Sequence, residues 1–126
     1  MILSFKPQFV DKILDGIKIH TIREDKNERW KPGRMIHFAT GVRTRKYNQF
    51  TYSSCKRIQT IKFRYDNKCS DYPGIWIDGV EHRIYHIPNI LLKLSFNDGF
   101  NSVKDFLRWF NKDFEGVIIH WTDFKY

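Results

Sequence analysis

The segment from Gly16 to Arg23 contains four side chains that can take part in chemistry, namely Lys18, His20, Thr21 and Arg23. A hydroxyl becomes a nucleophile when a base takes its proton, and a lysine amine can be that base if burial or a neighbouring cation lowers its pKa. Lys18 and Thr21 therefore have the chemistry of an activated nucleophile. His20 and Arg23 are able to polarise a carbonyl or to lower the pKa of the lysine.

A carboxylate far along the chain completes this set. Asp98 lies in the sequence Asn97-Asp98-Gly99, shortly before an expected helix. A carboxyl group in this place can act as general acid or base for a leaving amine. The alternative interpretation is a turn residue, because Asp is common near helix starts. The catalytic hypothesis thus rests on Lys18, Thr21 and Asp98.

The spacing of Lys18 and Thr21 imposes a geometric condition on that hypothesis. In a regular strand, residues three positions apart point to opposite faces. A joint site requires irregular backbone, such as a Lys18 that still belongs to the turn after Gly16. A regular strand from Ile17 onward would exclude the pairing. Ordinary interpretations remain for each residue, because surface lysines, strand threonines and hydrogen-bonded strand histidines such as His20 are common.

The net charge of +8, from 22 basic and 14 acidic residues, indicates a polyanionic partner. Solubility alone is the alternative explanation. Basic residues concentrate between positions 43 and 68, and tyrosines and phenylalanines interleave with them. Cations that hold phosphates, next to rings that stack on bases, are typical of proteins that bind single strands. We expect RNA or a modified nucleoside as the partner.

Further residues are candidates for ligand contacts. Arg23 and Arg43 are expected to hold phosphates or bases, although surface ion pairs would also explain them. Trp30 precedes a Pro-Gly turn and is expected to line a pocket edge, where its ring can stack on a base. The full binding set is His20, Arg23, Trp30, Arg43, Thr44 and Arg45.

No metal or cofactor is expected. Two cysteines do not make a disulfide framework. Cys55, Cys69, His82 and His86 can be written as a zinc set, but the two cysteines are too far apart for the usual knuckle, so inert thiols and strand histidines are the preferred interpretation. The chain has no apolar run of the roughly 18 residues that a membrane span needs. The start lacks the pattern of a signal peptide, so we expect a cytoplasmic protein.

The elements that must position these residues follow from alternation and turn signals. About six short strands are expected, in the stretches 1–5, 17–23, 35–40, 55–65, 75–78 with 83–87, and 117–124. Helices are expected over 7–15 and over 103–110, with a helical turn in 88–96 and a long mobile loop or loose hairpin over 41–54. The apolar start of 117–124 predicts a central strand buried on both faces. The sequence favours one α+β, mainly β domain that closes as a small barrel.

Several of these motifs, in this order, resemble the ASCH domain family of PUA-like β-barrels. The resemblance rests on Leu14-Asp15-Gly16-Ile17-Lys18 with Thr21-Ile22-Arg23, on Trp30-Lys31-Pro32-Gly33, on Gly41-x-Arg43-Thr44 and on Asn97-Asp98-Gly99-Phe100 before a helix. It spans nearly the whole chain, as a single domain over 1–126. The element G-x-K-x-x-T-I-R is moderately specific, and the other motifs are useful only together.

The resemblance implies a PUA-like small β-barrel with two or three short helices at its rim, and a cleft that binds nucleic acid or a nucleoside. The family includes a small bacterial amidohydrolase that removes the acetyl group from acetylcytidine. Carried over by position, its Lys and Thr are Lys18 and Thr21, and Asp98 stands where that enzyme has Glu. This chain also has additional residues through about 40 to 80. Binding of RNA or a modified nucleoside is the first expectation, because the basic charge and the interleaved aromatic residues favour it. Deacylation of an acylated nucleoside is the alternative, favoured by Lys18 and Thr21 at the family spacing. A domain that regulates a partner protein is a third possibility.

Overall fold

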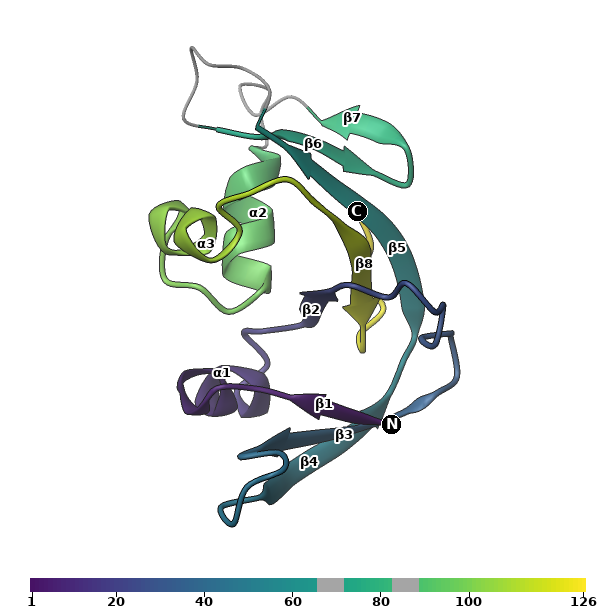
Figure 1. The fold of residues 1–126 in the computed structure, drawn as a ribbon, viewed down its shortest axis with the longest axis vertical. Coiled ribbons are helices and arrows are strands. Elements are labelled where there is room, and N and C mark those ends of the chain that lie inside the picture. Colours follow the sequence, from purple (N-terminus) through teal and green to yellow (C-terminus); the bar gives the residue numbers. More distant parts are fainter. Residues whose placement is uncertain (66–71, 83–88) are drawn as a thin grey trace.

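The computed structural model describes residues 1–65, 72–82 and 89–126, and it shows an α+β fold that is mainly β. The described strands form one sheet of three strands and one of five, and the described helices lie on one side of the larger sheet and beside the smaller one (Figure 1). No closed barrel is formed by the described residues, so the two sheets are best considered separately.

The smaller sheet contains β1 (Ile2–Ser4), β3 (Met35–Thr40) and β4 (Asn48–Ser54), in the order β1-β3-β4. β1 runs parallel to β3, whereas β3 and β4 are antiparallel. The chain therefore passes from β1 through the first α-helix and the strand after it before it returns to β3 beside β1. Of the two alternatives expected over 41–54, the structure forms the hairpin, because β4 pairs with β3 on either side of a register shift at Phe38 and Ala39.

The larger sheet is antiparallel and has the order β2-β8-β5-β6-β7. Its strands are β2 (His20–Arg23), β8 (Phe114–His120), β5 (Arg57–Arg64), β6 (Gly74–Ile77) and β7 (Val80–His82). β8 lies between β2 and β5. Two consecutive residues of β8, Ile118 and Ile119, are both fully buried. Adjacent strand residues point to opposite faces, so the predicted two-sided burial is confirmed.

The first two helices are short, and their ends follow from local chemistry. A 3-10 turn (Pro7–Phe9) leads into α1 (Val10–Leu14), with Pro7 in the first turn, where its missing N–H costs no hydrogen bond. The chain leaves α1 through Gly16, whose φ of +76° lies in the left-handed region that glycine tolerates. The predicted helix over 7–15 and its end at Gly16 are confirmed.

The other two helices are capped by side chains. In α2 (Ile90–Asn97), Asn89 accepts a hydrogen bond from the Leu91 N–H, and in α3 (Val103–Trp109), Ser102 accepts one from the Asp105 N–H. The expected helical turn in 88–96 is a full helix, and the helix expected over 103–110 is confirmed as α3. None of the helices in the described ranges is long and apolar enough to cross a membrane.

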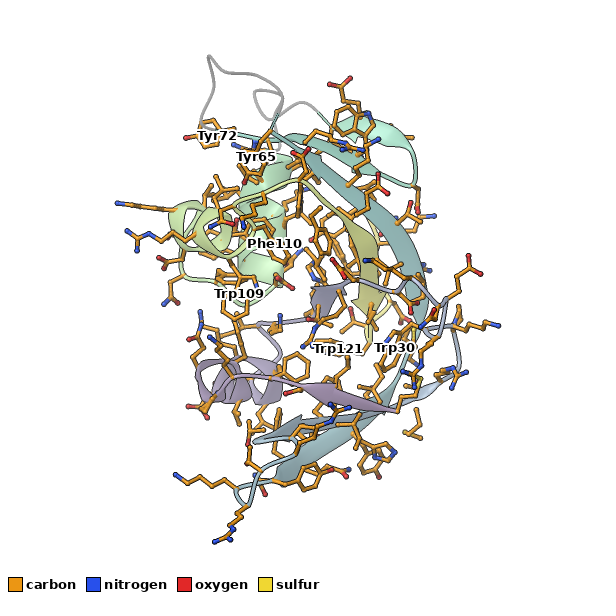
Figure 2. The ribbon with its side chains drawn as sticks, in the orientation of Figure 1. Trp30, Tyr65, Tyr72, Trp109, Phe110 and Trp121 are labelled. Carbon is orange, nitrogen blue, oxygen red and sulfur yellow. The ribbon has the colours of Figure 1, made fainter. Side chains whose placement is uncertain are left out.

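The core lies on two sides of the larger sheet's β2 and β8. Phe63 from β5, Phe106 from α3 and Phe110 pack together, with ring centroids 5.0 to 5.9 Å apart. Towards the smaller sheet, Trp121 packs against Phe38, with ring centroids 4.8 Å apart. Trp30 belongs to this core and Trp121 packs against it; both are labelled in Figure 2. These ring contacts pack α3 against β5 and the segment after β8 against β3.

One sequence expectation falls outside the described residues. The expected strand over 83–87 belongs to a range that is not described. The strand that follows β6 in the structure is β7, which ends at His82. The strand expected over 17–23 begins only at His20, and this difference decides the geometry of the candidate site.

Candidate active site

Irregular backbone separates Lys18 from the strand that follows it. After Gly16, the N–H groups of Ile17 and Lys18 both donate to the Lys12 carbonyl at 2.9 Å, which prolongs the end of α1. Ile19 N–H then donates to the Asn97 carbonyl at 2.9 Å, and regular pairing starts at His20. The geometric condition for a joint Lys18–Thr21 site is therefore fulfilled.

Lys18 and Thr21 line one cavity of about 330 Å³ that lies between β1, β2 and the helical segments. Arg23 and Asp98 line it as well, and Lys6 joins them from the end of β1. Much of the remaining wall is aromatic and comes from Phe5, Phe9, Phe100, Trp109 and Phe110. A concave, mostly apolar wall with a few convergent polar groups is typical of a small-molecule site.

Lys18 and Asp98 form a buried ion pair. Lys18 Nζ lies 3.0 Å from Asp98 Oδ1 and 2.5 Å from the Asp98 carbonyl oxygen, and the two side chains are 3% and 4% exposed. The ammonium also lies 4.8 Å from the centroid of the Phe9 ring. Burial lowers the pKa of Lys18 and outweighs the opposing attraction of Asp98, with a smaller lowering from Arg23 and Lys12. The amine is thereby closer to the neutral form that a base requires.

The turn after Asp98 brings the backbone against this lysine. Gly99 has a φ of +89°, and a Cβ at this position would lie 2.9 Å from Lys18 Cδ and 3.1 Å from Phe9 Cδ1. A side chain here would displace Lys18 or the Phe9 ring. The requirement for glycine is thus both conformational and steric.

Arg23 organises the other wall of the cavity around Thr21. Its Nε donates to Thr21 Oγ1 at 3.1 Å, and its Nη2 donates to the Ser4 carbonyl at 2.5 Å. The guanidinium carbon lies 5.0 Å from the centroid of the Phe5 ring. Because the guanidinium bonds to the hydroxyl oxygen, it stabilises the negative charge that forms if Thr21 loses its proton. The hydroxyl proton is not used by that bond.

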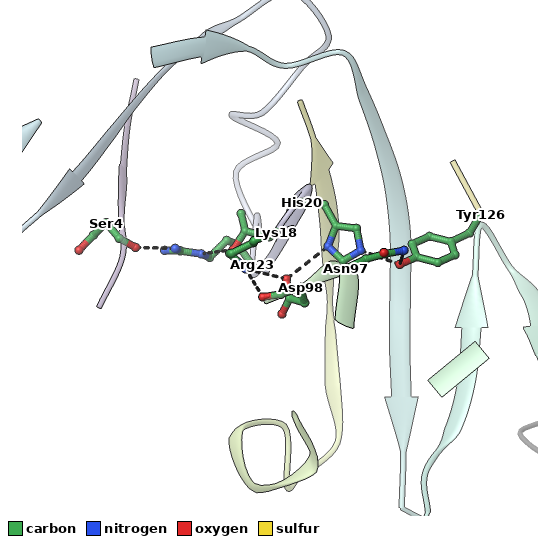
Figure 3. Close-up of polar contacts among 8 residues, drawn as sticks. Ser4, Lys18, His20, Arg23, Asn97, Asp98 and Tyr126 are labelled. Atoms are coloured by element: carbon green, nitrogen blue, oxygen red, sulfur yellow. Dashed lines mark hydrogen bonds and ion pairs between the residues drawn. The ribbon is translucent and has the colours of Figure 1, made fainter. Parts of the chain in front are cut away.

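His20 lies behind Asp98 and continues a chain of hydrogen bonds (Figure 3). Asn97 Nδ2 lies 3.1 Å from Tyr126 Oη, Tyr126 Oη lies 2.6 Å from His20 Nε2, and His20 Nδ1 lies 3.2 Å from Asp98 Oδ1. If Asn97 donates to the tyrosine, the tyrosine donates to Nε2 and Nδ1–H donates to the carboxylate. Burial lowers the pKa of His20, which favours this neutral tautomer.

A second buried group supports Tyr126 from the β5 side. Gln59 accepts hydrogen bonds from the Tyr126 N–H at 2.9 Å and from His120 Nε2 at 3.0 Å, and it donates to Asp78 at 2.9 Å. Burial, with smaller effects of His20 and Arg57, lowers the pKa of His120 to about 3. Its Nδ1 is the buried side-chain atom that finds no partner among the described residues.

The structure unites some of the predicted residues and separates others. Lys18, Thr21, Arg23 and Asp98 share the cavity, with His20 behind them. Trp30 is 9% exposed, belongs to the core and does not line the cavity at Lys18, so its role as a ligand contact stays a prediction. Its N–H donates to Asp25, which folds the turn so that the ring packs inward.

Arg43, Thr44 and Arg45 lie at the tip of the hairpin between β3 and β4, and they are exposed. The Thr44 hydroxyl donates to the Gly41 carbonyl at 2.6 Å and so stabilises the turn. None of the three lines the cavity at Lys18. Their role as ligand contacts stays a prediction, and it concerns a surface separate from the cavity.

Several residues of the site had no role in the predictions from sequence, among them Lys6, Asn97, Tyr126 and Trp109, which is 46% exposed. Only Asn97 had a local signal, because it directly precedes Asp98 in a polar turn. Tyr126 reaches His20 through tertiary structure across 106 positions of the chain, which no local pattern reveals.

The zinc alternative involves residues outside the described ranges. Cys69 and His86 are not described, and His82 lies on β7. Cys55 is buried, its Sγ lies 3.7 Å from the Arg57 carbonyl, and burial raises its pKa. These features describe a thiol that is poorly suited to give up its proton.

No family model, curated protein or solved structure matches this chain. The ASCH resemblance therefore stays a prediction, and the chemistry of the cavity has to be argued from its own residues.

Proposed function

We propose that this chain is an amidohydrolase that removes an acyl group from a planar nucleoside base such as that of acetylcytidine. Lys18 is the base, Thr21 the nucleophile, and Asp98 holds the lysine. The observation that carries the proposal is that the backbone break before His20 lets Lys18 and Thr21 line one cavity together. The ASCH, PUA-like architecture is part of the same proposal, in which the two sheets correspond to a barrel that is not closed.

The proposed reaction uses water and needs no further reactant. Neutral Lys18 takes the Thr21 proton as the hydroxyl oxygen attacks the acyl carbon. The C–N bond then breaks, and the amine leaves with the proton held by the lysine. Water hydrolyses the ester on Thr21, releasing a carboxylic acid and restoring the hydroxyl. Arg23 stabilises the negative charge that develops near the threonine oxygen.

The direct test is hydrolysis of acetylcytidine, followed by chromatography of cytidine and acetate. Lys18→Met keeps much of the side-chain volume and removes the base, so we expect turnover to fall by at least about a hundredfold. Thr21→Val removes the hydroxyl, whereas Thr21→Ser retains it and should retain measurable turnover. Lys26→Met, at a lysine whose side chain is 85% exposed, is the matched control and should resemble the parent protein.

Two results would contradict the proposal. One is a purified, folded protein that hydrolyses neither acetylcytidine nor related acylated bases above background. The other is turnover that Thr21→Val leaves unchanged, which would assign the attack to water and remove Thr21 from the reaction.

A second candidate function is binding of single-stranded RNA by the hairpin between β3 and β4. The observation that favours it is that Arg43, Arg45 and Lys46 are all exposed there, with Tyr47 45% and Tyr52 69% exposed on the same hairpin. Exposed cations next to exposed rings provide both phosphate contacts and stacking surfaces.

This second function is tested by titration with single-stranded RNA at several salt concentrations. Changing Arg43, Arg45 and Lys46 together to Gln should weaken binding at all sequences and reduce the salt slope by about one per lost phosphate contact. A triple variant that binds RNA as tightly as the parent protein, with the same slope, would exclude the hairpin as the binding surface.

A further inference from the structure

The walls of the cavity carry more positive than negative charge. Three basic residues line it, Lys6, Lys18 and Arg23, against one acidic residue, Asp98. The carboxylate is already paired with Lys18 at 3.0 Å. No carboxylate of the described residues forms an ion pair with Lys6 or with Arg23. Two cations are therefore left at the cavity with no anionic partner in the described chain.

Of the two cations, Arg23 is the stronger indication that the cavity binds an anion. Arg23 is half-buried, and burial lowers its pKa, with only partial opposition from Asp98, so the guanidinium has lost part of its contact with water. Charges in such places are ordinarily paired, because loss of water is costly for an unpaired ion. Its bonds to Thr21 and Ser4 use two of five N–H groups, which leaves donors for another acceptor.

The fixed geometry of Arg23 suits it to an oxyanion. Two hydrogen bonds and the face of Phe5 hold the guanidinium plane in place. A planar donor group fixed in this way binds carboxylates and phosphates without a further loss of side-chain freedom. Its position in the cavity wall, next to Thr21, makes the ligand the natural source of that oxyanion.

Lys6 is the second cation, and it is exposed at the cavity with Trp109. Its Nζ lies 4.9 Å from the centroid of the Trp109 ring, and both side chains line the cavity. The indole ring is 46% exposed and provides a surface for a planar base, while the ammonium above it provides charge. The Lys6 ammonium and the Trp109 ring therefore lie together in the same part of the cavity wall.

We propose that the ligand of this cavity is a nucleotide, a planar base that carries a phosphate, and that Arg23 and Lys6 bind the phosphate. This inference rests on the proposed function for the acylated base and adds the phosphate to it. A nucleoside without phosphate leaves Arg23 and Lys6 without an anionic partner. The substrate class is then an acylated nucleoside monophosphate.

The test compares binding of acetylcytidine and acetylcytidine 5′-monophosphate by isothermal titration at low salt. We expect the nucleotide to bind at least about tenfold more tightly, the size of effect that a charged hydrogen bond gives. Lys6→Ala should remove part of this preference, because it takes away one of the two cations that bind the phosphate. Lys6 is exposed, so the variant should fold like the parent protein. Lys26→Ala removes the same unit of charge elsewhere and should preserve the preference.

Three outcomes would overturn the inference: equal affinity for the two compounds, equal effects of Lys6→Ala and Lys26→Ala, or tighter binding of orotate, a planar ring with a carboxylate, than of the nucleotide. Turnover separates this inference from the proposed function. Equal hydrolysis and binding of both compounds would retain the amidohydrolase and reject the phosphate site. Phosphate-dependent binding without any hydrolysis would retain the phosphate site and reject the amidohydrolase.

Discussion

Lys18 Nζ and Asp98 Oδ1 lie 3.0 Å apart in a pair that is almost fully buried and joins two segments 80 positions apart. The pair ties the irregular segment before β2 to the end of α2. Removing one partner of such a pair leaves an uncompensated buried charge, whereas removing both does not. The pair therefore contributes to structure as well as to the proposed chemistry.

Asp98→Asn should lower the free energy of unfolding by about 3 to 5 kcal/mol, because Lys18 is left buried with no carboxylate. The double variant Lys18→Met with Asp98→Asn should recover part of this loss. Urea denaturation followed by tryptophan fluorescence measures both. If the loss of unfolding free energy in the double variant equals the sum of the losses in Lys18→Met and Asp98→Asn, the two residues do not interact energetically.

Gly99→Ala should destabilise the fold and displace Lys18, since the new Cβ would lie 2.9 Å from Lys18 Cδ. Gly33→Ala is its matched control, with a similar φ of +93° against +89° but no atom within 4 Å of the new Cβ. Both variants bear the strain of a left-handed backbone, about 1 to 2 kcal/mol. Only Gly99→Ala should cost more than that and also reduce turnover. Equal losses at the two glycines would mean that contact with Lys18 is unimportant.

Tyr126→Phe tests the hydrogen-bond chain behind Asp98. The variant removes the donor 2.6 Å from His20 Nε2 and should cost about 1 to 3 kcal/mol of stability, because a buried acceptor is left unpaired. Imidazole ¹⁵N shifts should report His20 protonated on Nδ1 in the parent protein, and a changed tautomer balance in the variant. Tyr52→Phe, on an exposed ring, is the control. Protonation of Nε2 in the parent protein would contradict the assigned direction of the chain.

His120 should make the fold less stable in acid. Its pKa is about 3 in the folded chain against 6.5 ordinarily, so between these values the unfolded chain binds a proton that the folded chain does not. The free energy of unfolding therefore falls as the pH drops from 6.5 towards 3, by at most about 1.4 kcal/mol per pH unit for this group. The lowered pKa of His20 acts in the same direction.

His120→Gln should reduce the slope of the unfolding free energy against pH by the equivalent of up to one bound proton. Urea denaturation at pH values from 4 to 8 measures this slope. Above about pH 7.5 the two curves should run parallel, because the imidazole is then neutral in both states. An unchanged slope between pH 4 and 6 would mean that His120 is protonated equally in the folded and unfolded chains.

Local patterns predicted those elements whose residues decide their own conformation. The alternation of Met35 to Thr40 matches β3 in full, and the Ser102 cap begins α3 one residue later. The apolar run Val117 to Ile119 correctly indicated a central strand. In each case, neighbours in the sequence provide the deciding pattern or hydrogen bond.

Pairing between distant segments was beyond such patterns. The sequence suggested a closed barrel, whereas the described strands form two sheets, in one of which β1 pairs with β3 across more than thirty positions of the chain. Trp30 has the same local features whether it lines a pocket or fills a core. Its actual burial depends on how the turn after β2 packs against the rest of the chain.

The sequence by itself determined which chemical groups are present, and it narrowed the candidate catalytic residues to Lys18, Thr21 and Asp98. Only the tertiary structure decided that Lys18 leaves the alternation of β2, because the Lys12 and Asn97 carbonyls that hold the backbone there belong to α1 and α2. It also decided the lowered pKa of Lys18, since desolvation depends on every segment that covers a group. Residue types follow from the chain, whereas distances and burial follow from its packing.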